Sequence, residues 1–312
     1  MRLADVLQLP EAQALLRFQQ ENPTDRSARL IFTDYLRDQQ LDEIADCVSR
    51  SLELSGAVLL PDGSRYVYDG WVQTPSFEIA QGVWVEFCWI PAGRALLGSP
   101  ESEKMRGIDE REHTYETAGF WLGKYPVTQE QWQGVMGNNP SHFKGARLPV
   151  ETVSWEDCQK FIKKCKVAGF KLKRPQEDEW EYACRGGLGN KQAFYWGETL
   201  NGDKANCDGN YPYGTTTLGA YLEETTEVGS YEKVAPQPWG LCDMSGNVWE
   251  WRDNLYTSEG SGRVFRGGCW NFLSRDCRSA DRGRIDPAYS DDNLGLRLAL
   301  VPLAETDIHK NK

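Results

Sequence analysis

The stretch WGLCDMSGNVWEW, residues 239–251, carries the strongest fold signal in this sequence. Gly246 permits a tight turn because it has no Cβ atom. Trp249 and Trp251 follow the turn, and two Trp side chains supply a large apolar area. We therefore expect this turn and the residues after it to lie in the core of the domain.

Outward from this stretch the sequence falls into two composition regimes. All twelve Trp residues lie at or after residue 71, whereas residues 1–56 contain none and hold one Gly. Apolar residues recur at helical spacing in residues 10–20, 23–40 and 41–54, which predicts a small helical module. Residues 57–84 predict a linker or hairpin, and residues 303–312 a tail.

Residues 85–302 form the second regime, and helix starts within it are marked. Thr128 and Ser154 open two predicted helices, each followed three residues later by Gln or Asp in the capping-box pattern. Pro175 begins a third helix and Gly186 ends it. Beyond Gly186, short apolar runs alternate with Gly-rich turns. This pattern predicts short strands and loops without a long helix.

Charge and composition exclude several classes of protein. The chain has 312 residues and a formal net charge of −11, so it can bury a sizeable core and is a poor phosphate binder. We expect no nucleic-acid partner. No apolar run of about 20 residues and no signal peptide are seen, which favours a cytoplasmic protein without a membrane span. Nine scattered Cys residues predict reduced thiols, and three separate His residues give no metal triad.

A series of segments, in this order, resembles the formylglycine-generating enzyme (sulfatase-modifying factor) family. They are WIPAGRALLGSPESE (89–103), GFWLGKYPVTQEQWQGVMGNNPSHF (119–143), LPVETVSWEDC (148–158), LKRPQEDEWEYACRGG (172–187), WGLCDMSGNVWEW (239–251), FRGGCW (265–270) and NLGLRLAL (293–300). The resemblance covers residues 85–302 and implies an α+β, C-type-lectin-like fold with little regular secondary structure. Residues 1–56 resemble a helical module that precedes varied domains in planctomycete-like bacteria.

The resemblance also implies a structural calcium ion. The side chains of Asp243 and Glu250 and the backbone carbonyls of Gly246 and Val248 match the positions of the family's calcium loop. Hard oxygen ligands on a tight loop suit calcium. The alternative is that this loop serves only as a turn in the core.

Catalysis in this family depends on two cysteines that bind copper, and paired thiolates favour copper(I). Phe272 stands at the first of these positions and Cys277 at the second, while Cys269 is expected to face the core. Since one thiolate is a weak copper site, the sequence predicts a protein that is not an enzyme. A copper oxidase with Cys277 as its catalytic residue, or another peptide-modifying enzyme, stays open as an alternative.

The segment CWNFLSRDCRSADRGRIDPAYSDDN, residues 269–293, carries a binding signal instead. Among residues typical of a scaffold it mixes aromatic, aliphatic, small and acidic types without periodicity, which suits a recognition surface. It resembles the variable region of diversity-generating-retroelement variable proteins, in which Asn codons are mutated at their adenines. The predicted ligand-binding residues are Trp270, Asn271, Phe272, Leu273, Ser274, Asp276, Asp281, Gly283, Ile285, Asp286, Ala288, Tyr289, Ser290, Asp291 and Asp292.

These residues predict a display protein that binds a protein or peptide ligand. Phe272, Leu273, Ile285 and Tyr289 would be its apolar anchors, and the five Asp residues of the segment would form a rim that favours a basic partner. A catalytically silent domain with one fixed partner would use the same segment and is the second alternative. The sequence gives neither the ligand nor the oligomeric state.

Overall fold

The computed structural model describes most of the chain from residue 73 to residue 302 and short pieces before it. The described residues are 9–12, 14–15, 31, 34–39, 57–59, 65–68, 73–91, 93–167, 169–187, 189–257 and 260–302. Within the predicted N-terminal helices, residues 10–12, 14–15, 31 and 34–38 are helical. Residue 39 is a turn, and the remaining residues of those predicted helices, including all of 41–54, and the tail 303–312 lie outside the described residues.

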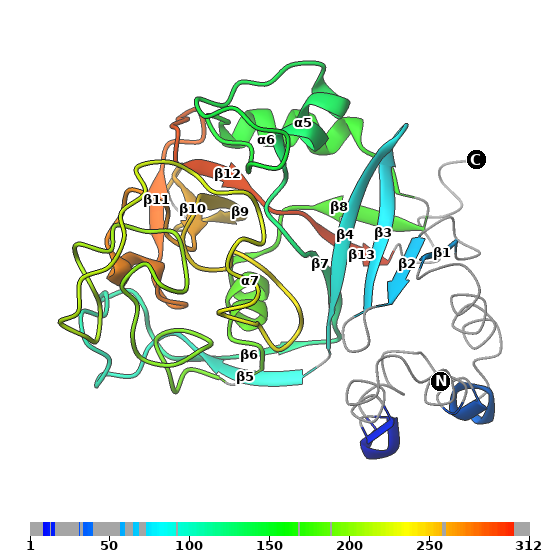
Figure 1. Cartoon of the computed structure of the whole chain (residues 1–312), viewed down its shortest axis with the longest axis horizontal. Helices are drawn as coiled ribbons and strands as arrows, with labels where there is room; N and C mark the ends of the chain where they lie inside the picture. The colour runs from blue at the N-terminus through cyan, green and yellow to red at the C-terminus, as the bar shows by residue number, and fades with distance from the viewer. Residues whose placement is uncertain are drawn as a thin grey trace.

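A seven-stranded antiparallel sheet forms one side of the molecule (Figure 1). Its strands, in spatial order, are β1 (Ala57–Leu59), β2 (Arg65–Tyr68), β3 (Gln73–Ala80), β4 (Val83–Ile90), β7 (Phe120–Gly123), β13 (Ala299–Pro302) and β8 (Phe170–Lys173). The predicted linker or hairpin therefore contributes strands to this sheet, and Gly82, at φ 74°, lies in the turn between β3 and β4. β13 pairs with both β7 and β8, so the end of the domain returns to its beginning.

A four-stranded sheet lies on the opposite side of the molecule (Figure 1). Its spatial order is β11 (Gly283–Ile285), β10 (Arg263–Arg266), β9 (Trp249–Leu255) and β12 (Leu294–Leu296). β12 is parallel to β9, whereas the other pairs are antiparallel. A separate ribbon is made by β5 (Gly93–Leu97) and β6 (His113–Thr117).

The described α-helices of the domain are α5 (Gln129–Met136), α6 (Trp155–Lys164) and α7 (Glu177–Cys184). The side chains of Thr128 and Ser154 accept hydrogen bonds from the backbone of Gln131 and Asp157, which confirms both predicted capping boxes. Among the described residues after α7 only the short 3-10 helix η1 (Ser274–Cys277) occurs, as predicted. None of the described helices is both long and apolar enough to cross a membrane.

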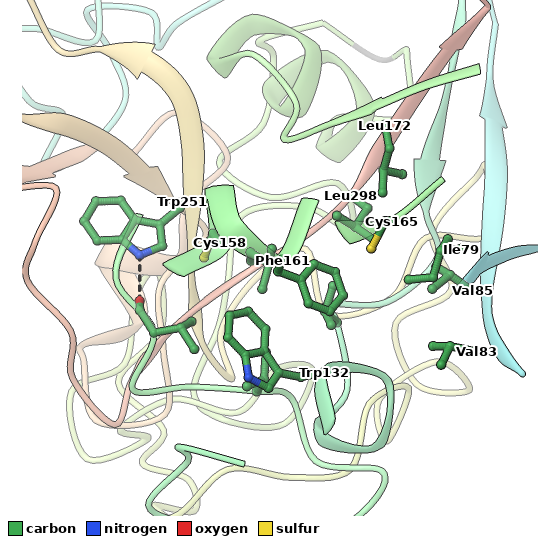
Figure 2. Packing of buried hydrophobic residues seen from close by; sticks show 14 of the residues in the cluster. Ile79, Val83, Val85, Trp132, Cys158, Phe161, Cys165, Leu172, Trp251 and Leu298 are labelled. Atoms are coloured by element: carbon green, nitrogen blue, oxygen red, sulfur yellow. Dashed lines mark hydrogen bonds between the residues drawn. The ribbon is translucent and has the colours of Figure 1, made fainter. Parts of the chain in front are cut away.

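The largest apolar core joins the two sheets through α5 and α6. Figure 2 shows Trp132 of α5 stacked on Phe161 of α6, with 4.9 Å between the ring centroids. Trp251 of β9 is fully buried in this core, and its Nε1 donates to the Val153 carbonyl at 2.9 Å. Trp249 is buried there as well, so the prediction for the 239–251 stretch is confirmed. Because both sheets share this core, the loops between β10 and β12 stand on a rigid base.

Candidate functional site

The predicted recognition segment, residues 269–293, runs from the end of β10 through η1 and β11 to the start of β12. Backbone hydrogen bonds fix it to other parts of the domain. The Trp270 N–H donates to the Asn247 carbonyl at 3.0 Å, and the Asp291 carbonyl accepts from the Thr152 N–H at 2.9 Å. The segment is therefore irregular in structure and still held in place near both ends.

Exposure divides the predicted ligand-binding residues into three groups. The exposed residues are Phe272, Asp286, Ala288, Tyr289 and Ser290, and the half-buried residues are Asn271, Leu273, Asp276, Asp281, Gly283, Ile285, Asp291 and Asp292. Phe272 and Tyr289 are 42% and 40% exposed, as anchors of a binding surface would be. Trp270 and Ser274 are buried, which differs from the prediction.

Packing explains the burial of these two residues. The Trp270 ring meets Phe143 edge-on at 5.3 Å and lies nearly parallel to Tyr221 at 6.3 Å between centroids. Its Nε1 also donates to the Asp292 carbonyl at 3.1 Å. The Ser274 Oγ lies 3.4 Å from the Cys207 Sγ in the interior. Ser274 is therefore removed from the candidate surface, and Trp270 forms its floor.

Two of the predicted rim acids face arginines. The Asp281 carboxylate lies 3.4 Å from the Arg278 guanidinium, and burial raises the pKa of Asp281 to about 8. The Asp276 carboxylate accepts from the Leu273 N–H at 3.2 Å and pairs with Arg275 at 3.3 Å. Because these local partners hold both carboxylates, we leave Asp276 and Asp281 out of the candidate surface. The acids left for the rim are Asp286, Asp291 and Asp292.

Gly283 and Ile285 belong to β11, and both contribute to the packing of this strand. A Cβ atom on Gly283 would lie 2.2 Å from the ring of Phe265, so the missing side chain lets β11 approach β10. Ile285 packs against the main core. We therefore correct the prediction and remove both residues from the candidate surface.

Two loops outside the segment complete the surface, and the sequence reasoning missed them. Phe143 and Tyr221 flank Trp270. The Tyr211 carbonyl accepts from the Ser274 N–H at 3.3 Å, and the Tyr211 side chain is 58% exposed. The available signal was aromatic residues within Gly- and Thr-rich loops. We define the recognition face as Phe143, Tyr211, Tyr221, Asn271, Phe272, Leu273, Asp286, Ala288, Tyr289, Ser290, Asp291 and Asp292, with Trp270 as its floor.

Cys277 and Phe272, which stand at the family's two copper-ligand positions, lie in different environments. Cys277 is fully buried, and its hydrogen bond with Cys207, together with burial, raises the pKa of the Cys277 thiol well above its ordinary value. Phe272 packs edge-on against Trp249 at 5.6 Å, and Cys269 lies in the main core as predicted. The eight described cysteines are free and buried, which confirms the predicted burial for them.

The Glu250 carboxylate, a predicted calcium ligand, is enclosed by cationic and N–H donors. It accepts from Arg297 at 2.8 Å, from Arg252 at 2.6 Å and from the Trp180 Nε1 at 2.9 Å. Burial alone would raise the pKa of Glu250, but the two arginines hold it below its ordinary value. A calcium ion beside these oxygens would therefore face two buried guanidinium groups.

The other predicted calcium ligands, Asp243, Gly246 and Val248, stabilise the turn. The Asp243 carboxylate accepts from the Gly229 N–H at 2.7 Å, and burial raises its pKa to about 6. Gly246 has φ 78°, and a Cβ there would lie 2.4 Å from the Asn206 carbonyl oxygen, while Val248 is buried. These residues do not fit a calcium site.

Residues 77–301 match the family described as the sulfatase-modifying factor enzyme 1-like domain. The chain belongs to this family. The match begins within β3 and ends in β13, so the four-stranded sheet, the whole recognition face and the seven-stranded sheet from β3 onward belong to the sulfatase-modifying-factor-like domain, whereas β1 and β2 precede it. The resemblance drawn from the sequence segments is thereby confirmed.

Relatives with this domain include two mouse proteins. The formylglycine-generating enzyme of Mus musculus is 33% identical over 211 residues, which cover 61% of this chain and 53% of that protein. The inactive C-alpha-formylglycine-generating enzyme 2 of Mus musculus is 31% identical over 210 residues, or 64% of this chain and 62% of that protein. The sulfatase-modifying-factor-like chain thus spans less than two thirds of the length of both relatives.

Solved structures show the same fold. Treponema denticola variable protein 1 superposes with a TM-score of 0.55 and 24% identity, covering 77% of this chain and 99% of that chain. PvdO from Pseudomonas aeruginosa gives a TM-score of 0.59 and 23% identity, covering 73% and 98%. The sulfatase-modifying-factor-like domain therefore has the predicted α+β, C-type-lectin-like fold.

Proposed function

We propose that this chain is a display protein that binds a protein ligand at the recognition face. One observation carries the proposal. Along residues 269–293, residues of mixed chemistry such as Phe272, Ala288 and Tyr289 are exposed, whereas Cys277 and Ala280 between them are buried. Outward residues in such a segment can differ without disturbing the packing beneath them, which a recognition surface requires.

The recognition face is ordered before any ligand arrives. The Asp208 N–H donates to the Phe272 carbonyl at 2.9 Å, and the Asn293 side chain donates to the Asn271 side chain at 3.0 Å. The Tyr289 hydroxyl donates to the Asp291 carboxylate at 2.5 Å. Side chains that are already fixed lose little conformational entropy when they bind, which favours affinity.

We propose further that the outward residues of this segment are diversified by a retroelement. Every mixed residue of the segment can be encoded by replacing the adenines of an AAC codon, as the resemblance to variable proteins requires. The fold shared with Treponema denticola variable protein 1 is compatible with this role. A domain with one fixed partner would use the same face, but its codons would not be diversified. The DNA sequence of the gene therefore distinguishes a diversified binder from a domain with one fixed partner.

The proposal includes the absence of copper oxidase activity. Phe272 cannot bind a metal, and the Cys277 thiol and the Cys207 thiol to which it is hydrogen-bonded are both buried. Titration of the full chain with copper(I) against a chromogenic chelator should give no tight stoichiometric site. A tight site that Cys277→Ser abolishes would overturn this and favour the oxidase alternative.

Selection from a phage-displayed random peptide library against the immobilised full chain tests ligand display. We expect the enriched peptides to bind Phe272→Ala and Tyr289→Ala about tenfold more weakly than the unaltered chain, because exposed aromatic side chains dominate such contacts. Ile108→Ala is the matched control, since Ile108 is 90% exposed outside the recognition face. Equal binding to the chain and to both face variants would contradict the proposal.

A further inference from the structure

We propose that the recognition face contains a subsite for a basic side chain, a lysine or arginine of the protein ligand, at the aromatic cluster of Phe143, Tyr221 and Trp270. The inference rests on the proposed function and names the chemistry of one contact within it. The rings, the carboxylates around them and the scarcity of competing cations each support it.

The three rings come from three separate segments and meet around Trp270. Phe143 stands at 90° to the Trp270 ring, while Tyr221 lies within 12° of parallel to it. Phe143 and Tyr221 are partly exposed, and Trp270 keeps 8% of its surface exposed. Aromatic ring faces attract ammonium and guanidinium groups placed within about 6 Å of their centroids. The cluster therefore offers a cation an attraction that an aliphatic patch would lack.

Three carboxylates act electrostatically on the Tyr221 side chain. Burial raises the pKa of Tyr221, and so do the nearby charges of Asp208, Glu223 and Asp292. The main-chain carbonyl of Asp292 accepts from Trp270, so this acid is attached at the edge of the cluster. A basic side chain resting on the rings would lie close to these negative charges, and the two attractions would act together.

The segments around the cluster contain few cations that could neutralise these acids. Residues 138–144, 207–211, 218–224, 270–276 and 286–293 contain seven carboxylates, one arginine, one lysine and one histidine. The arginine, Arg275, pairs with Asp276 at 3.3 Å. The lysine is Lys144, and its ammonium group donates hydrogen bonds to the carbonyls of Asn139 and Ser141 in its own loop. The histidine is His142. The face is therefore complementary in charge to a basic partner.

The cluster also needs no rearrangement to receive a side chain. The Trp270 N–H and Nε1 donate to the Asn247 and Asp292 carbonyls, at 3.0 and 3.1 Å. The Phe143 N–H donates to the Glu151 carboxylate at 3.0 Å. Fixed rings lose little entropy on binding, so a single basic side chain should add measurable affinity.

Fluorescence anisotropy of the full chain with labelled (Gly-Arg)5, (Gly-Lys)5 and (Gly-Glu)5 peptides tests the subsite. We expect the arginine and lysine peptides to bind and the glutamate peptide not to bind. Tyr221→Leu keeps an apolar side chain but removes the ring, and it should weaken binding roughly threefold. Asp292→Asn should weaken binding by a similar factor and reduce its dependence on salt.

Glu116→Gln is the matched control for charge. Glu116 is an exposed acid on β6, which lies away from the β12 side of the molecule (Figure 1). It should leave the affinity for the arginine peptide unchanged. Equal losses in Glu116→Gln and Asp292→Asn would reduce the binding to general charge attraction and overturn the subsite, as would unchanged binding by Tyr221→Leu. Thermal melting of each variant checks that it is folded.

The library-selected peptides separate this inference from the proposed function. If they lose affinity with Phe272→Ala but keep it with Tyr221→Leu and Asp292→Asn, ligand display stands and the cation subsite fails. If none of these variants affects them, both fail. Loss with all three, together with enrichment of Arg or Lys in the selected peptides, supports both.

Discussion

At the scale of single residues, exposure separates side chains that can bind from those that hold the fold. Phe272 and Tyr289 are exposed, whereas Phe161 is fully buried. The sequence of the segment allowed either outcome, because an aromatic residue in an aperiodic stretch can pack or bind. Trp270 shows the limit of that reasoning, since the sequence placed it among the ligand-binding residues but did not show that it is buried as the floor of the recognition face.

Substitution of Phe272 and Phe161 by alanine should have very different costs. Phe272→Ala should lower the free energy of unfolding by about 1 kcal/mol, because Phe272 packs on Trp249 and otherwise faces solvent. Phe161→Ala should cost about 3–5 kcal/mol, because it leaves a cavity in the main core. Urea unfolding measures both. Equal losses would mean that Phe272 belongs to the core and that the recognition face is misplaced.

Asp281 should make stability depend on pH. Burial raises its pKa from 3.8 to about 8, so between these values the folded state keeps a proton that the unfolded state has lost. Its contribution to stability therefore falls as the pH rises through this range. Asp281→Asn should remove this part of the slope in urea unfolding, which is measured beside the unaltered chain. An unchanged slope in Asp281→Asn would contradict this assignment.

At the scale of elements, the features that could be predicted from the sequence depend on interactions between residues close together in the chain. Thr128 and Ser154 bond to the first turn of their own helices, so both caps could be recognised from four residues each. The recognition face is different because it depends on contacts between distant segments. The contact of Tyr221 with Trp270 and the contact of Phe265 with Gly283 join residues far apart in the sequence. Neither contact produces a local sequence pattern.

We expect that calcium does not change the stability of the loop of residues 243–250. Glu250 pairs with Arg252 and Arg297, so excess EDTA should leave the melting temperature unchanged. Arg297→Met should instead lower the free energy of unfolding by about 3–5 kcal/mol, because it breaks a buried ion pair. A melting temperature that falls with EDTA and recovers with added calcium would show that the metal site exists.

At the scale of the whole molecule, the fold joins a buried frame to a segment that places several side chains on the surface. Two sheets share one core through α5 and α6, and the segment between β10 and β12 spans the edge of the second sheet (Figures 1 and 2). Loops on such a rigid base can carry different outward residues at little cost in stability. Membership of the sulfatase-modifying factor family gives the frame, and the recognition face gives the proposed role.

The codons for residues 265–297 and the DNA around the gene test the central claim most directly. We predict a nearby reverse transcriptase gene and a near-copy of these codons that differs from them only where the copy carries adenines. Such a copy would establish a diversified binder. The absence of any copy would contradict diversification and leave a fixed domain that serves one partner.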